Sequence, residues 1–468
     1  MATATIPGFA GELVRPGDAT FDQHREIWNA MVDRRPVLIA RCTTSEDVAA
    51  ALRHARQENL EIGVKCGGHS IVGYSVPDGG LMIDLSPMSA VRIDAATRRA
   101  YVQGGSLLRN LDRATEPHGL ATTAGNVSHT GVGGLTLGGG MGWLARQFGL
   151  ACDNVASYTV VTADGEAVRA SADEHPDLFW GLRGGGGNFG VVTEFEFRLH
   201  PLSHTVLAVD RYFDPDDAPA ALRAWRDLLP DAPRQATLTA DVFTAAQDGS
   251  LPDRLSGRSV VGIGFTWVGD LGEGRRYLER FRDTGEALAE EVEEMRYVDL
   301  QSIADDVHHH GKRRYMKGHY LGELSDAAID AFIGRGVTSG VEPNWSRLPN
   351  GGLQSYGGAI RDVADDDAAF SHRRTLVEWG GSTTWLDAAE DEERIAAARD
   401  YGRAMEPFAT GVYVNTLMDE GEAGIRRAYN DAKLARLAEV KRRYDPDNVF
   451  HLNANIAPER RSAEAGAG

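Results

Sequence analysis

The chain has few of the features that mark secreted and membrane-spanning proteins. Its 468 residues include three cysteines, Cys42, Cys66 and Cys152, which are too few and too scattered for a disulfide framework. No stretch approaches the ~18–20 apolar residues of a membrane span. The N-terminal region holds no uninterrupted apolar segment of the kind that a signal peptide needs. The expected compartment is therefore the cytoplasm, with no membrane partner.

Basic residues are also scarce. Lys and Arg number 49 against 68 Asp and Glu, which gives a net charge of −19, and no run of Lys and Arg stands out. Because nucleic-acid-binding surfaces are basic patches or stripes, we expect no nucleic-acid partner. The favoured interpretation is that the charge keeps an enzyme for a small-molecule substrate in solution. The oligomeric state is left open, a homodimer included.

A chain of 468 residues is well beyond the about 250–300 at which a single core stops growing, so two large units, or one domain with a big insertion, are expected. The first opens with a predicted strand at Pro36–Ala40, a helix from Thr44 to about Glu58 and a strand at Glu61–Lys65. This β-α-β opening, followed by mixed strands, indicates the α+β or α/β class.

After Pro201 the pattern changes. Strand-like runs such as Val260–Val268 alternate with charged segments that predict helices, at Asp270–Glu294 and Asp326–Arg335. Glycine runs become rare there, which indicates a second, substrate-facing unit, and Glu420–Arg443 predicts one charged helix near the end. We therefore divide the chain into residues 1–201, 202–410, a C-terminal segment 411–458 and an expected disordered tail 459–468.

Glycine is abundant, at 54 residues, and it gathers in three clusters. The first is Gly67-Gly68, directly after a predicted strand, and the others span 131–142 and 184–190. Glycines let successive backbone N–H groups approach an anion closely, as a pyrophosphate-containing cofactor requires. One such run can be a tight turn, whereas three favour a cofactor site. None matches the dinucleotide-binding fingerprint or the Walker loop, so NAD and ATP are disfavoured.

The residues around these clusters resemble the vanillyl-alcohol oxidase superfamily of FAD proteins, in its berberine bridge enzyme-like branch. The resemblance runs from Pro36 to Pro458. It implies an α+β fold, with a two-subdomain FAD-binding domain (1–201), a substrate domain whose antiparallel sheet is covered by helices, and a segment 411–458 that returns to the FAD domain. The motifs that carry it are Val64–Ser70, Thr136–Gly142, Gly149–Val155, Leu178–Val192, Tyr444–Phe450 and Asn453–Ile456.

Carried over by position, the resemblance implies FAD bound covalently through His69, at a methyl carbon of the flavin ring. Such a tether raises the reduction potential of the flavin and helps it accept hydride. The other cofactor-binding residues that it implies are Lys65, Gly67, Gly68, Ser70, Gly133, Gly134, Gly138, Gly139, Gly140, Asn188, Val192, Asn453 and Asn455.

The sequence departs from the family at two points. Many members carry a second covalent link, from a cysteine shortly before the second glycine cluster, where this chain has about Val127. Cys152 lies beyond the cluster, so we expect a single link, which favours a smaller or less sugar-like substrate. The family often has a catalytic tyrosine directly after the Asn of a Tyr-x-Asn motif, but here Tyr413-Val-Asn415 is followed by Thr416.

Hydride transfer to a flavin needs a base that takes the proton of the substrate O–H or N–H. The candidate catalytic residues are Glu378, Tyr356 and Tyr413, on strand-like runs in or beside the predicted substrate domain. Alternation along Thr375–Trp379 places Glu378 on the face opposite Val377, where it can point at the flavin. The alternative for Glu378 is an exposed carboxylate in a salt bridge.

Three successive histidines, at 308–310, suggest a metal site at first sight. Adjacent residues of an extended segment point alternately, so these histidines do not converge on one ion. We expect a solvated charged loop and no metal. Lys317 and Tyr320 follow closely enough to reach the substrate site.

The predicted activity is that of an oxidase. An alcohol, lactol or amine carbon gives hydride to FAD, and O2 reoxidises the flavin to give H2O2. A dehydrogenase with a non-oxygen acceptor, and a flavin-binding protein without turnover, are the alternatives. The resemblance does not transfer the identity of the substrate.

Overall fold

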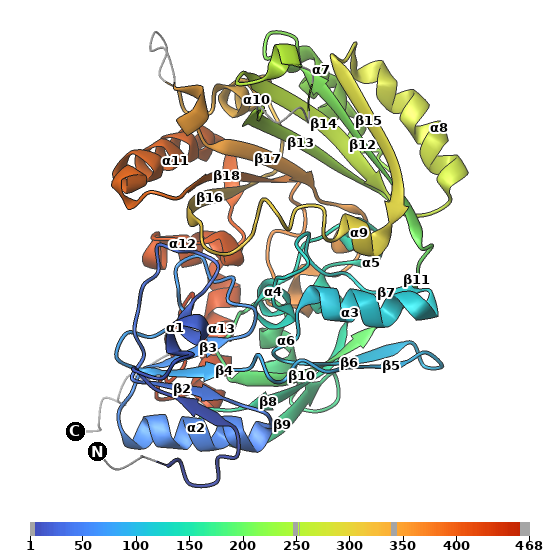
Figure 1. Cartoon of the computed structure of the whole chain (residues 1–468). Coiled ribbons are helices and arrows are strands. Elements are labelled where there is room, and N and C mark those ends of the chain that lie inside the picture. Colours follow the sequence, from blue (N-terminus) through green and yellow to red (C-terminus); the bar gives the residue numbers. More distant parts are fainter. Residues whose placement is uncertain (1–4, 247–250, 252, 338–343, 459–468) are drawn as a thin grey trace, which may run out of the picture.

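A computed structural model describes residues 5–246, 251, 253–337 and 344–458. Three main sheets form its framework (Figure 1). Two of them lie in the lower half of the view, and an eight-stranded sheet with its helices forms the upper half. This mixture of antiparallel sheets and helices confirms the expected α+β class. The predicted disordered tail, 459–468, lies outside the described residues.

The first sheet has the order β1-β2-β4-β3, with three parallel strands and β1 antiparallel. Helix α2 (Ser45–Gln57) connects β2 to β3 and begins with a capping box, in which Thr44 and Asp47 satisfy each other's backbone N–H. The first glycine cluster therefore follows the carboxyl end of a parallel strand. The strands are Glu12–Val14, Leu38–Arg41, Leu81–Asp84 and Ile62–Lys65.

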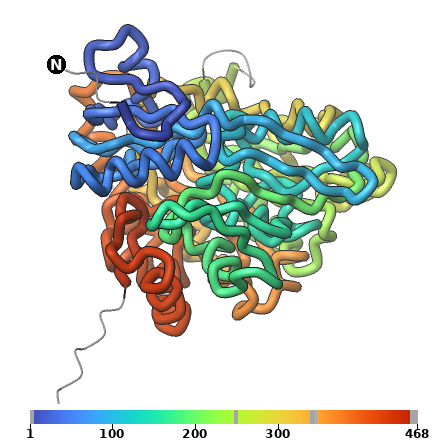
Figure 2. The backbone as a smooth tube through the Cα atoms, turned by 90° about the horizontal axis from the view of Figure 1, so that it is seen from below, coloured from blue at the N-terminus to red at the C-terminus, as the bar shows by residue number. Residues whose placement is uncertain are grey.

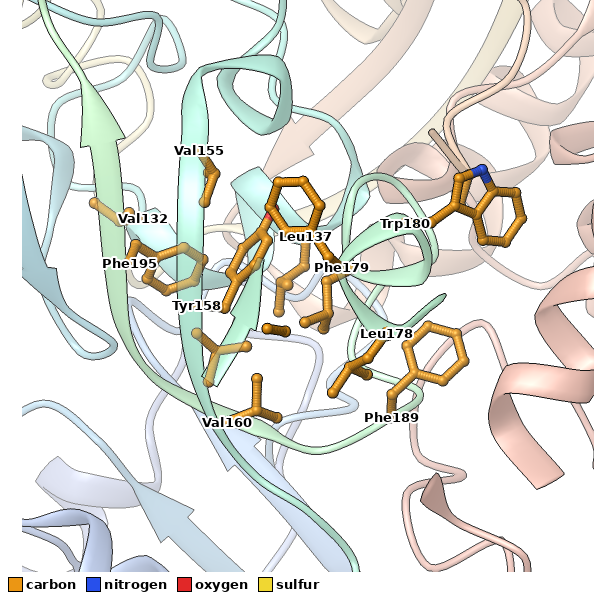
Figure 3. Packing of buried hydrophobic residues seen from close by; sticks show 14 of the residues in the cluster. Val132, Leu137, Val155, Tyr158, Val160, Leu178, Phe179, Trp180, Phe189 and Phe195 are labelled. Carbon is orange, nitrogen blue, oxygen red and sulfur yellow. The ribbon is translucent and has the colours of Figure 1, made fainter. Parts of the chain in front are cut away.

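The second sheet is antiparallel, with the order β5-β6-β10-β8-β9. Its core includes Tyr158, whose ring lies 5.5 Å from Phe195 and 5.8 Å from Phe179 (Figure 3). Part of the second glycine cluster folds as helix α4, which the sequence did not indicate because glycine disfavours helices. In sheet order, the strands are β5 (Val91–Asp94), β6 (Arg99–Gln103), β10 (Val191–Arg198), β8 (Val155–Val161) and β9 (Ala167–Ser171). The helices of this part are α3 (Leu108–Thr115), α4 (Val132–Gly138) and α6 (Pro176–Leu182).

The third sheet is antiparallel, with the order β15-β12-β14-β13-β17-β18-β16-β19. Helices α7 (Ala218–Leu228), α8 (Leu271–Phe281), α10 (Asp326–Gly334) and α11 (Asp391–Met405) pack on one face, and the other face is turned toward the smaller sheets (Figure 1). The strands, in sheet order, are Ala289–Arg296, Thr205–Phe213, Ser259–Trp267, Ala236–Thr244, Asn350–Ser355, Val377–Trp385, Arg313–Leu321 and Ala409–Gly411.

The predicted helix Asp270–Glu294 is wrong beyond Phe281. A short 3-10 turn follows α8, and the chain then forms β15 at the edge of the large sheet. The middle of β15 is exposed on both faces. It therefore carries charged residues at successive positions, whereas a half-buried strand would alternate apolar and polar residues. Charged residues on an edge strand hinder pairing with other chains.

The predicted single helix Glu420–Arg443 is two helices, α12 (Gly421–Ala428) and α13 (Asp431–Tyr444). The break falls at Asn430, whose side chain accepts a hydrogen bond from the N–H of Lys433 and caps α13. Helix α13 packs against α6, so the end of the chain (red in Figure 2) lies beside the second sheet and its helices (green).

Short elements complete the chain, and none alters the architecture. In the described part of the protein, no helix has the length and apolar character needed to cross a bilayer. The short elements are α1 (Phe21–Arg25), β7 (Leu120–Ala121), α5 (Ala145–Phe148), β11 (His200–Pro201) and α9 (Tyr297–Leu300).

Candidate active site

The first two glycine clusters are pressed against each other. A Cβ atom at Gly67 would lie 2.4 Å from the backbone nitrogen of Gly131, so no side chain fits between the loops. Gly68 has a φ of 70°, a backbone conformation that favours glycine. Gly133 packs against the carbonyl oxygen of Gly104, 3.1 Å from where its Cβ would be. The clusters are therefore parts of one site.

Other glycines border open space. A Cβ atom at Gly134 or Gly187 would meet no atom within 4 Å. The side-chain amide oxygens of Asn453 and Asn455 are buried and have no hydrogen-bond partner among the described residues, although the Asn453 amide donates to the carbonyl of Gly187 at 3.3 Å. Because buried polar atoms normally have partners, a glycine-walled space with free amide oxygens fits a large polar ligand such as FAD.

The glycines at 138–140 border protein. A Cβ atom at Gly138 would lie 2.2 Å from the Oδ1 atom of Asn415, and one at Gly139 would lie 2.7 Å from the ring of Phe370. Close packing of protein segments therefore accounts for glycine at Gly138, Gly139 and Gly140. Their contact with FAD stays a prediction.

Asn188 holds the C-terminal segment in place. Its Nδ2 atom donates to the carbonyls of Gly185 at 2.8 Å and Ala454 at 3.2 Å, and its Oδ1 atom accepts from the N–H of Ile456 at 3.0 Å. These bonds fix residues 453–456 beside the third glycine cluster. The predicted contact of Asn188 with the nucleotide half of FAD is not tested by them.

A buried ion pair accounts for the Tyr444–Phe450 motif at the end of α13. The carboxylate of Asp445 accepts from Lys441 at 2.6 Å and from the backbone N–H of Val449 at 2.7 Å and of Phe450 at 2.8 Å. Lys441 also donates to the carbonyls of Asn188 and Phe450, each at 2.8 Å. Both charged side chains are 0% exposed. The pair therefore joins α13, the third glycine cluster and the end of the chain.

His69 lies among aromatic rings. The indole of Trp28 stacks on it, with ring centroids 4.8 Å apart and planes 13° from parallel. Its Nε2 atom is 2.7 Å from the Nδ1 atom of His129, its Nδ1 atom is 3.4 Å from the hydroxyl of Thr130, and the ring of His310 stands edge-on at 5.8 Å. Burial, and then the neighbouring imidazoles, lower the pKa of His69 well below its usual value. His69 is therefore neutral and keeps a lone pair.

Three other predicted cofactor residues have protein partners. The amine of Lys65 donates to the carbonyl of His24 at 2.5 Å, and the hydroxyl of Ser70 accepts from the N–H of Tyr74 at 3.0 Å. Val192 is 4% exposed, within the core of the second sheet. Their contacts with FAD stay predictions.

Glu378 and Tyr356 meet on the open face of the large sheet. Val377 and Trp379 point into the core under the helices, so Glu378 on β18 points the other way, as its alternation predicts. The hydroxyl of Tyr356 donates to the Oε2 atom of Glu378 at 2.7 Å, and the hydroxyl of Tyr320 lies 3.3 Å from that of Tyr356. Two candidate catalytic residues and Tyr320 therefore form one group.

Within this group only Glu378 is suited to act as a base. Burial raises the pKa of Glu378 to about 7, and the hydrogen bond from Tyr356 offsets this only in part. A carboxyl with a pKa near the working pH is well matched to general-base catalysis. Burial and the nearby carboxylate raise the pKa values of Tyr320 and Tyr356 well above normal, so both hydroxyls stay protonated and act as donors.

A row of glycines lies next to this group. Gly318 pairs with Gly380, and Gly380 pairs with Gly352, across three neighbouring strands. Gly380 is two residues from Glu378 and so shares its face of the sheet. A Cβ atom at Gly380 would meet no atom within 4 Å. Gly380 therefore leaves open space beside the carboxyl group, whereas a Cβ atom at Gly318 would lie 2.5 Å from the hydroxyl oxygen of Thr416 and one at Gly352 would lie 3.1 Å from the Oδ1 atom of Asp241.

Tyr413 connects the second glycine cluster to the end of the chain. Its hydroxyl accepts from the N–H of Gly140 and from the side-chain amide of Asn415, both at 2.9 Å. Burial is the main cause that raises the pKa of Tyr413, which keeps the hydroxyl protonated. Its predicted catalytic role stays a prediction. Lys317 lies away from the site, where its amine pairs with Asp419 and Glu420, both at 2.6 Å.

Four residues at the site were missed at the level of sequence: Trp28, Asn126, His129 and Gln354. The amide of Asn126 donates to the Oε1 atom of Gln354 at 3.0 Å, and Gln354 is the cross-strand neighbour of Glu378. This bond joins the sheet face to the loop before the second glycine cluster. His129 and Asn126 could have been noticed in the sequence, because they stand just before the second glycine cluster. The position of Gln354 beside Glu378 depends on the register of two strands, which the sequence does not reveal.

These features define a class of protein. A glycine-walled space with free amide oxygens, a neutral histidine beside it and a part-buried carboxyl group on the facing sheet together describe an FAD-dependent oxidoreductase. Family models agree, because an FAD binding domain matches residues 36–171 and a berberine and berberine-like domain matches residues 412–457.

The chain belongs to the berberine bridge enzyme-like branch of the vanillyl-alcohol oxidase superfamily of FAD-linked oxidases. It is 31% identical to (R)-6-hydroxynicotine oxidase of Paenarthrobacter nicotinovorans, over 97% of this chain and 98% of that protein. It is 29% identical to glucooligosaccharide oxidase of Sarocladium strictum, over 94% and 90%. The crystal structure of 6-hydroxy-D-nicotine oxidase from Arthrobacter nicotinovorans has a TM-score of 0.84 at 28% identity, covering 98% of this chain and 100% of that one.

Proposed function

We propose that this enzyme carries FAD covalently on His69 and oxidises a small organic substrate, with Glu378 as the base and O2 as the electron acceptor, giving H2O2. The observation that carries the proposal is the part-buried Glu378–Tyr356 pair, on the sheet face that Gln354 joins to the loop before the second glycine cluster. Residues 1–201 and 411–458 would then bind the cofactor, and residues 202–410 the substrate.

The roles of the protein groups follow from their contacts. FAD, when bound, supplies a two-electron acceptor for the hydride of a substrate C–H bond. Ionised Glu378 takes the proton of the substrate O–H or N–H group. Tyr356 holds the Oε2 atom of Glu378 at 2.7 Å, and Gly380 provides open space on the same face of the strand. The substrate lies in that space, between the sheet and the glycine clusters.

A single link through His69 is supported by the state of the thiols. A solved structure of glucooligosaccharide oxidase is described with a 6-S-cysteinyl, 8α-N1-histidyl FAD. In this chain the position expected to match that cysteine is about Val127, which has no nucleophile. Burial raises the pKa of the Cys66 thiol to about 11 and that of Cys152 well above normal. Since the thiolate is the nucleophile, neither is suited to form a second link.

The charge of the sheet face favours an amine among the three substrate classes. Asp241 lies in register with Gly352 and Gly380, and Asp210 lies in the same lateral row as Glu378. Desolvation, and then neighbouring carboxylates, raise the pKa of Asp241 to about 7 and of Asp210 to about 6. A positively charged amine above Gly380 would be attracted by Glu378 and by Asp241, two strands away, when they are ionised, whereas a neutral sugar gains no such attraction.

The first test is a denaturing gel viewed under ultraviolet light, with mass spectrometry of the tryptic peptide that contains His69. A fluorescent band and a peptide heavier by one FAD are expected. Flavin that dissociates on denaturation contradicts the covalent link.

Reduction of the bound flavin without oxygen then tests the activity. We expect small amines to bleach the flavin faster than oligosaccharides, and air to restore it with formation of peroxide. Bleaching that only a dye or quinone reverses indicates a dehydrogenase. A flavin that no substrate of either class reduces indicates a protein without turnover.

A further inference from the structure

We propose that a cavity between helices α3 and α9 is a second binding site, separate from the active site, for a small zwitterion such as a free α-amino acid. The ammonium group of the ligand binds the carboxyl group of Asp112 and the amide oxygen of Gln301. Its carboxylate binds the guanidinium groups of Arg109 and Arg113. The cavity has a volume of about 200 Å³. It is smaller than the about 300–1,000 Å³ of sites for drug-sized molecules, so it suits a small ligand.

The cavity lies where the two units of the chain meet. Helix α3 belongs to the first unit and α9 to the second, and the two helices are in contact (Figure 1). Arg109 stands three and four positions before Asp112 and Arg113, so the three side chains share one face of α3. Gln301 follows α9 directly and lines the same cavity. A ligand bound there therefore contacts both units.

The floor of the cavity offers hydrogen-bond acceptors that lack partners. Asp112 is 4% exposed and Gln301 is 1% exposed. The Nε2 atom of Gln301 donates to the Oδ2 atom of Asp112 at 3.2 Å, which is the only hydrogen bond of that carboxyl group among the described residues. The Oε1 atom of Gln301 is buried and has no partner in the described part of the chain. Because buried polar atoms normally have partners, the floor calls for a donor group from a ligand.

The charge of Asp112 favours a donor group that is a cation. Burial raises the pKa of Asp112 to about 7, and the hydrogen bond from Gln301 offsets this only in part. A buried carboxylate without a positive partner is costly, and an ammonium group supplies both the charge and the N–H donors. The floor therefore suits an ammonium group better than a neutral hydroxyl.

A single water molecule accounts for a neighbouring free group, but it does not fill this cavity. The hydroxyl of Tyr297 is also buried and has no partner among the described residues. It faces a separate cavity of about 10 Å³, which Asp112 lines as well and which has room for about one water molecule. The cavity beside Gln301, at about 200 Å³, has room for a molecule of several atoms.

The rim of the cavity provides positive charge for an anionic group. Arg109 and Arg113 are exposed, and their guanidinium groups have no ion pair or hydrogen bond among the described residues. The other charged groups of the wall already have partners: Arg296 pairs with Asp299 at 2.6 Å and with Glu116 at 3.5 Å, and Asp305 accepts from the hydroxyl of Ser128 at 2.6 Å. Since guanidinium groups bind carboxylates well, a ligand that satisfies both floor and rim is a zwitterion.

The test is thermal unfolding of the holoenzyme with each of the standard amino acids, followed by calorimetric titration with the one that stabilises it most. We expect saturable binding of one ligand per chain and a melting temperature that rises with its concentration, as for any ligand that binds only the folded state. The amine and the acid that each lack one charged group of this amino acid should bind at least about tenfold more weakly. If no amino acid binds, water alone fills the cavity and the proposal fails.

Variants assign the binding to this cavity. Asp112→Asn removes the buried charge at constant shape, and Arg109→Ala/Arg113→Ala removes the exposed guanidinium groups, so both should keep the flavin absorbance of the wild type. Each should weaken binding about 10–100-fold, the loss of hydrogen bonds to charged groups. The matched control, Arg280→Ala, changes an exposed arginine of α8 and should bind like the wild type. Wild-type affinity in Asp112→Asn or in the double variant overturns the site.

A further variant separates this site from the active site. Glu378→Gln changes the proposed catalytic base and should bind the amino acid with wild-type affinity. If Glu378→Gln loses the ligand while Asp112→Asn keeps it, the amino acid binds in the active site, which overturns the second site and leaves the proposed function standing.

Discussion

Glu378 stands where an ionised carboxyl group is unstable. It lies on a sheet face with one hydrogen bond, from Tyr356, and burial is the first cause that raises its pKa to about 7. In the proposed role of Glu378 as the base, the same burial makes its ionised carboxylate a stronger acceptor for a substrate proton. Activity and stability therefore make opposite demands on this residue, and each demand can be measured.

The first prediction concerns catalysis. Glu378→Gln should lower the rate of flavin reduction by substrate about 10²–10⁴-fold, because the base is lost while the shape is kept. In the wild type this rate should rise with pH through about 7 as Glu378 ionises. Tyr356→Phe removes a hydrogen bond that lowers the pKa of Glu378, so it should move the profile to higher pH. Anaerobic stopped-flow absorbance measures all three, and an unchanged rate in Glu378→Gln would exclude Glu378 as the base.

The second prediction concerns stability. The pKa of Glu378 is above that of an unfolded chain, so the folded state binds more protons between about pH 4.5 and 7, and the contribution of Glu378 to stability falls as the pH rises through that window. Glu378→Gln should therefore be more stable than the wild type at pH 8, by about 1–3 kcal/mol, and not at pH 4.5. Urea unfolding at the two pH values measures the difference. An equal effect at both would show that ionisation is not its cause.

Among the elements, strand β18 separates the proposed substrate space from the core. On one face Gly380 borders open space, and on the other a Cβ atom at Gly381 would lie 2.6 Å from the ring of Trp379. The two adjacent positions therefore require glycine for different reasons: Gly380 leaves room for a ligand, and Gly381 leaves room for the indole of Trp379.

The third prediction uses this pair. Gly380→Val should raise the KM for substrate at least about tenfold with little change in the melting temperature, because the side chain fills the substrate space. Gly381→Val should lower the melting temperature by several degrees, because overpacking a core costs about 1–3 kcal/mol. Steady-state kinetics and thermal unfolding of both variants measure this. A normal KM in Gly380→Val would place the substrate elsewhere.

The elements also show how far sequence reasoning reaches. Alternation along β18 was enough to predict the face of Glu378, because side-chain direction in a strand is a local property. It did not reveal Gln354 as the neighbour of Glu378, since that depends on the register of two strands. Strand β15 was predicted as helix because its exposed edge carries charges on both faces. His129 meets His69 across 60 residues of chain, a contact that no local pattern encodes.

At the scale of the whole molecule, the site is closed by the end of the chain. Asn188 binds residues 454 and 456, and Lys441 joins α13 to the same place through three hydrogen bonds. The third glycine cluster and the C-terminal segment therefore depend on one buried ion pair, between Lys441 and Asp445.

The fourth prediction tests this dependence. Lys441→Met leaves Asp445 buried without its partner and should lower the free energy of unfolding by about 3–5 kcal/mol, together with the flavin content. The matched control is Arg442→Met, in the next position of the helix, whose pair with Glu439 is 4.0 Å long and exposed, and it should change stability by less than about 0.5 kcal/mol. Denaturant titration and flavin absorbance measure both. Equal effects of the two variants would contradict the role of the ion pair.

The closure also sets an order of events in the cell. A ribosome releases the first glycine cluster hundreds of residues before Asn453, so the nascent chain presents a cofactor site with one wall missing. Domains begin to fold during synthesis, N-terminal part first, but this site is complete only when the C-terminal segment docks. We therefore expect cofactor capture to follow the docking of the C-terminal segment. When riboflavin is scarce, we expect full-length polypeptide without flavin to accumulate, so that the amount of holoenzyme follows the supply of the vitamin.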